Sequence, residues 1–329
     1  SVRWKRGGSE MRPNLRVVSI VSALLILVPL VVPSWVVFIL TKSLFIFMAV
    51  LGVALFLRGG QVTFGHALFY ATGTYTVGFS VKWFGFRELL LLVPMGALTG
   101  LIMAALVGLI MARYRGVFFA MLNLAFSMIL YAILLKFYWV TGGTDGIAVG
   151  TATFLGLPLP AGTYPFYYFT LVIAGLITYV VYRFLASPLG YFLRAIADNE
   201  IRIEYSGESV RRVIYLTYNL AGGLGGVSGV LAAFAVGHVV PEDAFWFMSG
   251  QFVFIALLGG FEGILGSLMG AVAFEFIQTY SSKYFPYAWQ LTLGGIMLFI
   301  ILFRPGGLWA IYESLASRFS SKAEGSTHG

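Results

Sequence analysis

The sequence of 329 residues contains no cysteine, and the shortage of reactive groups removes several classes of function. Without cysteine the chain has no disulfide, no thiolate nucleophile and no thiolate metal site. No metal signature, His-Glu-x-x-His, Gly-x-Ser-x-Gly or Walker sequence occurs either. We therefore expect no catalytic residue, no metal and no cofactor bound by this chain, and any ATP-driven step has to take place in another subunit.

Charged residues are also scarce, at 10% of the chain, whereas hydrophobic residues reach 59% and phenylalanine alone occurs 30 times. This composition excludes a soluble globular protein. The apolar runs are continuous and do not alternate as the strands of a membrane barrel do. The sequence therefore predicts an all-α polytopic integral membrane protein. The formal net charge of +8 reflects basic residues near the ends of the spans, so it indicates cytoplasmic loops and gives no evidence of nucleic acid binding.

Apolar runs of about 20 residues, the length a helix needs to cross a bilayer, divide the chain into roughly ten membrane segments. We expect a basic cytoplasmic segment at 1–16, a transmembrane domain at 17–303 and a cytoplasmic tail at 304–329, so that both termini are cytoplasmic. No small-residue cleavage site follows the first run, which is therefore expected to be retained. The predicted spans are 17–32, 35–57, 62–83, 89–112, 117–137, 165–185, 213–236, two short helices within 247–280 broken by glycines at 259–263, and 287–303.

The loops at 138–164 and 238–243 carry no lysine or arginine, which places them outside. Lys42 lies in the outer part of its span and is expected to extend to the interface. The loop at 187–212, by contrast, is strongly charged. Pro188 and the i,i+4 pairs from Arg194 through Asp198 to Arg202 predict one short surface helix that Gly207 ends. Such a helix either joins two spans or is held by another subunit.

Polar residues within the spans must be satisfied there, either by hydrogen bonds between helices or by lining a translocation path. Small residues recur at spacing four near 221–233, which predicts a close helix contact. His238 and Asp243 match a His-x4-Asp spacing found in acyltransferases, but two fixed positions arise easily by chance, and these lie outside. The candidates for the path are Gln61, Thr63, His66, Asn123, Ser127, Asn219, Ser228 and Gln251.

Five blocks in the chain resemble the permease subunits of bacterial ABC importers for branched-chain amino acids, of the LivM type. The resemblance covers about residues 40–309. The blocks are Gly60–Ala67 (GQVTFGHA), Arg115–Met121 (RGVFFAM), Thr141–Gly146 (TGGTDG), Arg194–Glu200 (RAIADNE) with Gly207, and Leu258–Gly260 (LGG) with Phe303–Leu308 (FRPGGL). Ala54, Leu57, Asn123 and Tyr191 depart from the usual pattern of the family, and these departures leave the substrate open.

The resemblance implies that the charged loop docks into a cytoplasmic ATPase subunit through Arg194, Ala195, Asp198, Asn199, Glu200 and Gly207. It also implies a second, LivH-like permease, two ATPases that bind ATP and Mg²⁺, and an extracytoplasmic solute-binding protein facing Thr141, Asp145 and Glu242. The location would be the bacterial cytoplasmic membrane, in contact with lipid. Related systems carry urea, short amides or carboxylic acids as well as amino acids.

Two hypotheses follow. In the first, the chain is a non-catalytic permease subunit that forms half of the path for a small polar solute, most simply a branched-chain or other amino acid. In the second, it is an autonomous carrier or channel that uses His66 or Glu275, although acids near the bilayer midplane are few. A membrane enzyme lacks a catalytic constellation. Pairing with a second copy of the chain also stays open.

Overall fold

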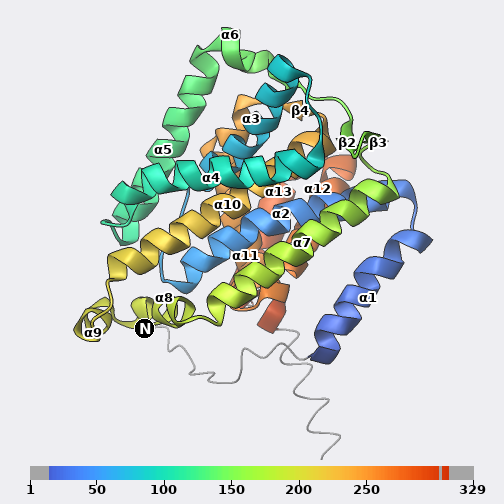
Figure 1. The fold of residues 1–329 in the computed structure, drawn as a ribbon. Helices are drawn as coiled ribbons and strands as arrows, with labels where there is room; N and C mark the ends of the chain where they lie inside the picture. The colour runs from blue at the N-terminus through green and yellow to red at the C-terminus, as the bar shows by residue number, and fades with distance from the viewer. Residues whose placement is uncertain (1–14, 304–305, 311–329) are drawn as a thin grey trace, which may run out of the picture.

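The computed structural model describes residues 15–303 and 306–310, so the predicted 1–16 segment and the 304–329 tail lie almost wholly outside the described residues. Long helices dominate the described part (Figure 1). The helices are α1 (Leu15–Val31), α2 (Ser34–Arg58), α3 (Ala67–Phe84), α4 (Leu89–Met111), α5 (Gly116–Lys136), α6 (Tyr138–Thr141), α7 (Tyr164–Leu185), α8 (Pro188–Asp198), α9 (Glu200–Tyr205), α10 (Val210–Val236), α11 (Trp246–Gly259), α12 (Ile264–Tyr284) and α13 (Trp289–Phe303). Short elements fill the loops: the 3₁₀ turns η1 (Gly143–Asp145) and η2 (Pro241–Ala244), and the strands β1 (Ile147–Ala148), β2 (Ala152–Phe154), β3 (Leu157–Leu159) and β4 (His238–Val239).

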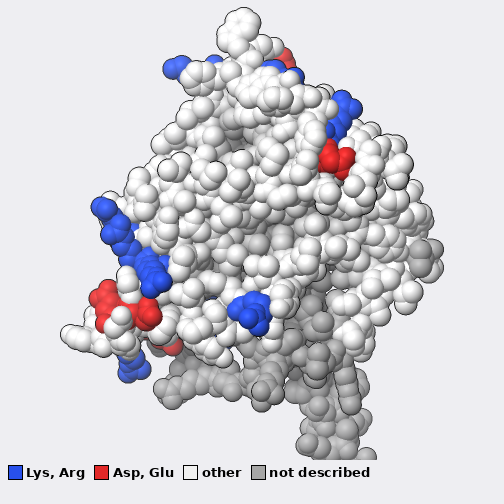
Figure 2. Space-filling view, viewed as in Figure 1, with Lys and Arg blue, Asp and Glu red and all other residues white. Residues whose placement is uncertain are grey.

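Within the described residues, five helices are long and apolar enough to cross a membrane, namely α2, α4, α5, α7 and α10. The pair α11 and α12 adds a sixth candidate, bent by 116° at its break, where the sequence predicts a glycine turn. Figure 2 shows that charged side chains gather over α8 and α9 at one end and around α6 at the other, with a wide uncharged area between them. The chain is therefore an all-α, multi-pass membrane protein, and the count of ten segments stays a prediction.

Helix α10 lies at the centre of the molecule and packs against α4, α3 and α2 (Figure 1). Its glycines make the contact close: a Cβ atom at Gly226 would collide with the backbone of Gly96 on α4, and one at Gly229 would collide with the backbone of Tyr70 on α3. Small residues let helix backbones approach where lipid offers no hydrophobic drive for association. The predicted small-residue contact face is confirmed.

The third predicted span begins later than expected. Residues 61–66 are not helical, and α3 starts at Ala67, whose backbone N–H donates to the Ser249 hydroxyl of α11 at 2.8 Å. Gly60, with φ of +69°, turns the chain away from α2. Gly65 then passes so close to the backbone of Asn123 on α5 that a side chain would collide there. The apolar composition of the sequence gives no sign of this non-helical segment.

The loop at 187–212 also differs from its prediction, because it forms two helices instead of one. Asn199 has extended backbone angles (φ −165°, ψ 106°) and separates α8 from α9. Its side-chain oxygen accepts a hydrogen bond from the N–H of Arg202 at 3.3 Å, which caps α9. Asparagine side chains compete with the helical backbone in this way. Gly207, with φ of +85°, ends the pair as predicted.

At the opposite end of the molecule, the loop after α5 and the loop after α10 form small sheets. Strand β1 pairs antiparallel with β4, with Ile147 opposite Val239, and β2 pairs with β3 in a hairpin. This pairing places the loop after α5 directly against the loop after α10. We call this region the α6 end and the opposite region the α8 end.

Candidate functional site

Helix α8 lies against the end of α2. Leu193 of α8 is buried beside Gly59, where an added Cβ would lie 2.7 Å from Leu193 Cδ1. A Cβ atom added at Gly60 would lie 3.2 Å from the Cα atom of Ala197 on α8. The positive φ of Gly60 also disfavours any side chain at this position. Together Gly59 and Gly60 form a flat seat that lets the α8 backbone approach the core.

An ion pair fixes α9 to the turn between α4 and α5. Arg115 Nε lies 2.8 Å from Glu200 Oε1, with 27% and 35% of the two side chains exposed. Arg115 Nη1 also donates to the carbonyl oxygens of Ala112 and Tyr114, at 2.9 and 2.8 Å. These bonds orient the guanidinium group, which gives the pair a defined geometry although water screens it.

A third contact joins the same region to the turn between α11 and α12. Arg58, the last residue of α2, donates from Nε to the carbonyl oxygen of Phe261 at 2.6 Å. Its charge interacts with Arg194 and Glu262. Partial burial lowers the pKa of Arg194, while Tyr191 and Glu262 oppose that shift. The charged groups of α8 and of the glycine turn are therefore electrostatically linked.

The glycine turn between α11 and α12 packs against residues 306–309. A Cβ atom at Gly260 would lie 2.6 Å from the carbonyl oxygen of Gly306, and Trp309 packs over Gly263. The two parts of the fifth sequence block, separated by about forty residues, therefore meet at this point. A fourth contact joins two further blocks, because the Gly116 N–H donates to Gln61 Oε1 at 2.8 Å.

We call this assembly the α8–α9 platform: α8 and α9 together with residues 58–61, 115–116 and 261–262. Its outward face carries large apolar groups that the described residues do not cover, with Tyr191 62%, Ile201 63% and Tyr205 88% exposed. Charged groups lie among them (Figure 2). Among the predicted coupling residues, Asp198 and Asn199 are exposed, Arg194, Ala195 and Glu200 are half-buried, and Gly207 is exposed.

Sequence reasoning missed Arg58, Arg115, Glu262 and the glycine seat as parts of this region. Arg115 and Gly60 appeared only as members of separate sequence blocks. The order of the blocks along the chain does not show which blocks lie close together in the folded protein. The signal that could have grouped them is that each block lies at the same end of a predicted span.

Most of the polar residues predicted for the path form hydrogen bonds within the chain. Tyr218 OH donates to Asn123 Oδ1 at 2.5 Å, Ser127 Oγ to the Ala244 carbonyl at 2.7 Å and Ser228 Oγ to the Phe45 carbonyl at 2.6 Å. Asn219 Nδ2 donates to the Tyr215 carbonyl at 2.8 Å. Asn123 and Ser228 thus fit the interhelical alternative that the sequence left open, whereas Ser127 bonds to η2 and Asn219 bonds within α10.

The remaining path candidates differ in exposure. Thr63 is buried and accepts from the Gly65 N–H at 3.3 Å, whereas Gln251 is partly exposed. His66 is fully buried, and neither ring nitrogen has a hydrogen-bond partner among the described residues. Its ring packs edge-on against Phe69 and Phe252, with centroids 5.6 and 6.1 Å apart.

At the α6 end, the predicted binding-protein contacts separate into exposed and buried residues. Asp145 and Glu242 are exposed. Thr141 is 3% exposed, and its hydroxyl donates to the carbonyls of Leu134 and Phe137, so its side chain cannot face a partner as predicted. Its role is to hold the turn after α5.

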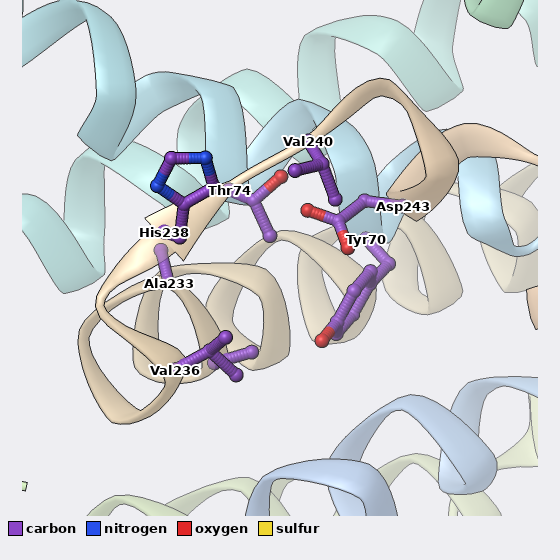
Figure 3. Close-up of a pocket in the computed structure, with 8 residues that line it drawn as sticks. Tyr70, Thr74, Ala233, Val236, His238, Val240 and Asp243 are labelled. Carbon is purple, nitrogen blue, oxygen red and sulfur yellow. The ribbon is translucent and has the colours of Figure 1, made fainter. Parts of the chain in front are cut away.

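His238 and Asp243 line one pocket of about 130 Å³ at this end (Figure 3). Two further lining residues, Tyr70 and Thr74 of α3, carry hydroxyl groups. His238 Nε2 also lies 2.8 Å from the Asp145 carbonyl oxygen, which ties β4 to η1. The hydroxyl groups of a tyrosine and a threonine beside a carboxylate provide oxygen atoms that can accept hydrogen bonds from a ligand.

The family model described as "Branched-chain amino acid transport system / permease component" matches residues 35–302. The high-affinity branched-chain amino acid permease protein LivM of Salmonella typhimurium is 26% identical in an alignment of 290 residues that covers 81% of this chain and 68% of that protein. LivM of Escherichia coli is 28% identical in an alignment of 277 residues that covers 76% of this chain and 64% of that protein. The chain thus spans about two thirds of the length of these relatives.

The nucleoside ABC transporter permease protein NupB of Lactococcus lactis is 32% identical over 97 residues, 29% of this chain and 26% of that protein. No solved structure matches the chain. The similarity to the LivM proteins therefore covers most of the chain, whereas the similarity to the nucleoside permease is local. The family match at 35–302 includes the α8–α9 platform.

Proposed function

The chain belongs to the family of permease components of branched-chain amino acid transport systems, and from this premise we propose that it is the non-catalytic membrane subunit of an ATP-driven importer. In this role it forms half of a translocation path for a small polar solute. The α8 end is cytoplasmic, the α6 end is extracytoplasmic, and ten segments cross the cytoplasmic membrane with both termini inside.

The observation that carries the proposal is the α8–α9 platform. Its exposed Tyr191, Ile201 and Tyr205 offer an apolar surface, ringed by charge, to a cytoplasmic ATPase. The platform rests on the end of α2, on the α4–α5 turn through the Arg115–Glu200 pair, and on the α11–α12 turn through Arg58. A displacement of α8 and α9 would therefore be transmitted to three transmembrane elements at once, as rigid-body coupling requires.

The proposed partners follow from the same premise. Two ATPase subunits bind ATP and Mg²⁺ on the cytoplasmic side, a second permease of LivH type completes the path, and a solute-binding protein docks at the α6 end near Asp145 and Glu242. We propose a branched-chain or other amino acid as the solute, because the relatives with the widest coverage are named for branched-chain amino acids.

The first experiment tests docking of the ATPase. The chain is expressed with the ATPase subunits of the same organism, solubilised gently and purified through a tag on the chain alone. Tyr205→Ala and Ile201→Ala are expected to reduce the co-purified ATPase at least about tenfold, because exposed aromatic and aliphatic anchors dominate interface energies. Leu157→Ala, at a residue 69% exposed in the hairpin of the α6 end, is the matched control and should leave the ATPase bound.

The second experiment tests coupling through the platform. Arg115→Glu or Glu200→Arg alone is expected to lower solute-stimulated ATPase activity, and the double swap should restore it because the charge pair is rebuilt. Retention of full coupling in both single variants would contradict the proposal. Solute flux in liposomes that contain this chain alone would instead support the autonomous carrier.

A further inference from the structure

The pocket at the α6 end lies where three elements meet. Tyr70 and Thr74 come from α3, Val236 from the last turn of α10, and His238 and Asp243 from the loop that follows (Figure 3). In Figure 3 the carboxylate of Asp243 and the hydroxyl of Thr74 lie near each other above the Tyr70 ring. Val236 is 60% exposed and lies at the edge of the pocket, whereas Tyr70 is 5% exposed.

The polar atoms of this pocket favour a positive charge. The Thr74 hydroxyl donates to the Ala71 carbonyl oxygen at 3.0 Å, and the Asp243 carboxylate near it (Figure 3) keeps lone pairs for a ligand. The C-terminal turn of α10 contributes to the wall through Ala232, Ala233 and Val236, and the end of a helix where carbonyl oxygens are unsatisfied attracts cations. No lysine or arginine lines the pocket.

The size and the remaining walls restrict which cation fits. A volume of about 130 Å³ is well below the roughly 300–1,000 Å³ of sites that enclose drug-sized ligands. Alanine and valine side chains form the rest of the wall, so a short aliphatic stem could lie against them. Donor-rich groups suit this site better than a bare metal ion, because no cluster of three or more His, Asp or Glu side chains occurs in the described residues.

We propose that this pocket binds a primary ammonium group, with Asp243 as its counter-ion and Thr74 and Tyr70 beside it. The group can belong to a small free amine or to an amino acid whose carboxylate end stays outside the pocket. The free-amine form goes beyond the proposed function, and only the amino-acid form rests on it, because it would provide the cargo with a first contact at the extracytoplasmic side.

Binding of a cation here depends on pH because Asp243 must be ionised. The pKa of Asp243 is raised to about 7, chiefly by burial and also by the charge of Glu242, while Thr74, Val240 and His238 oppose the shift. The charge of Asp243 in turn acts on Tyr70 and Tyr75 of α3. Glu275 also acts on Tyr70, and Glu242 also acts on Tyr75. Between pH 8 and pH 6 the ionised fraction of Asp243 falls about tenfold, so affinity should fall by a similar factor.

The test measures the thermal unfolding midpoint of the purified chain in lipid nanodiscs, without any partner subunit. Methylammonium chloride is titrated at pH 8 and pH 6, with sodium acetate as the control for ionic strength. A saturable rise of the midpoint at pH 8 that weakens at pH 6 is expected. At pH 8, Asp243→Asn should weaken the apparent affinity at least about tenfold, whereas Glu242→Gln, at the neighbouring exposed acid, should leave it nearly unchanged because Asp243 is already mostly ionised there.

Two further arms make the outcome unambiguous. Val236→Phe narrows the mouth of the pocket without changing any charge and should also abolish the effect, which covers the case of an unstable Asp243 variant. Leucine compared with N-acetylleucine separates the sources, since only an amino acid with a free ammonium group should act through Asp243. The proposal is overturned if methylammonium has no effect, if sodium acetate has the same effect, or if Asp243→Asn responds like the wild type.

This test is independent of the transport proposal. It uses no ATPase, so a failure here leaves the α8–α9 platform experiments unaffected. A failure of ATPase docking, in turn, leaves the methylammonium titration interpretable. If methylammonium binds and leucine does not, the site belongs to small amines and has no part in cargo recognition.

Discussion

Lys42 Nζ lies 2.9 Å from Glu275 Oε2, in an ion pair that joins α2 to α12 within the apolar part of the molecule. Glu275 is 1% exposed, whereas 28% of the Lys42 side chain is exposed. Lys42 therefore neutralises an acid that would otherwise be buried alone, and the expected extension of Lys42 to the interface stays a prediction. Glu275, one of the two residues considered for an autonomous carrier, is occupied by this pair.

The ion pair predicts an asymmetry between its two single variants. Lys42→Met leaves a buried carboxylate without a counter-ion and should destabilise the chain by about 3–5 kcal/mol at neutral pH. Glu275→Gln leaves a lysine that can turn its ammonium group toward solvent, so the cost should be smaller, about 1–2 kcal/mol. Unfolding in mixed detergent measures both. Equal losses, or a double variant no more stable than Lys42→Met, would contradict this account.

The apolar runs of the sequence predict the long helices to within a few residues, because a continuous apolar stretch has few other structures available in a membrane. The small residues near Gly226 likewise predict a close contact. The break at Asn199, the extended segment before Ala67 and the Lys42–Glu275 pair could not be predicted in this way. Each depends on a partner far along the chain or on a local capping bond that competes with the helix, and neither has a periodic signature.

The contact between α10 and α4 predicts that Gly226 tolerates no side chain. A Cβ atom there would overlap the backbone of Gly96, and backbone cannot move aside as a flexible side chain can. Gly226→Ala should therefore cost about 3 kcal/mol or more and reduce the yield of folded protein. The matched control is Gly175→Ala on α7, where nothing lies within 4 Å of the added atom. Monodisperse yield and thermal midpoint are the measurements, and equal behaviour of the two variants would refute the packing argument.

The hydrogen bond from Tyr218 to Asn123 predicts a structural role for a residue considered for the path. Tyr218→Phe leaves the buried Asn123 Oδ1 atom without this donor and should cost about 1–3 kcal/mol of stability. Tyr179→Phe, at a tyrosine 61% exposed on α7, serves as the control and should cost nothing measurable. In the assembled transporter, the half-saturating solute concentration should stay unchanged in Tyr218→Phe. A large shift in that concentration without a loss of stability would instead assign Asn123 to the path.

Asp243 predicts that the loop after α10 becomes less stable as the pH rises. Its ordinary pKa is 3.8, and burial raises the pKa to about 7 in the folded chain. Between these two values the unfolded loop binds fewer protons than the folded loop, so the free energy of local unfolding falls as pH increases and levels off above about 7. Amide hydrogen exchange in 238–245, corrected for the intrinsic pH dependence of exchange, should show protection decreasing between about pH 4 and pH 7. Asp243→Asn should remove this dependence, and Glu242→Gln should preserve most of it. Protection that increases with pH in the wild type would mean that the carboxylate of Asp243 is stabilised in its charged form, contrary to the burial found here.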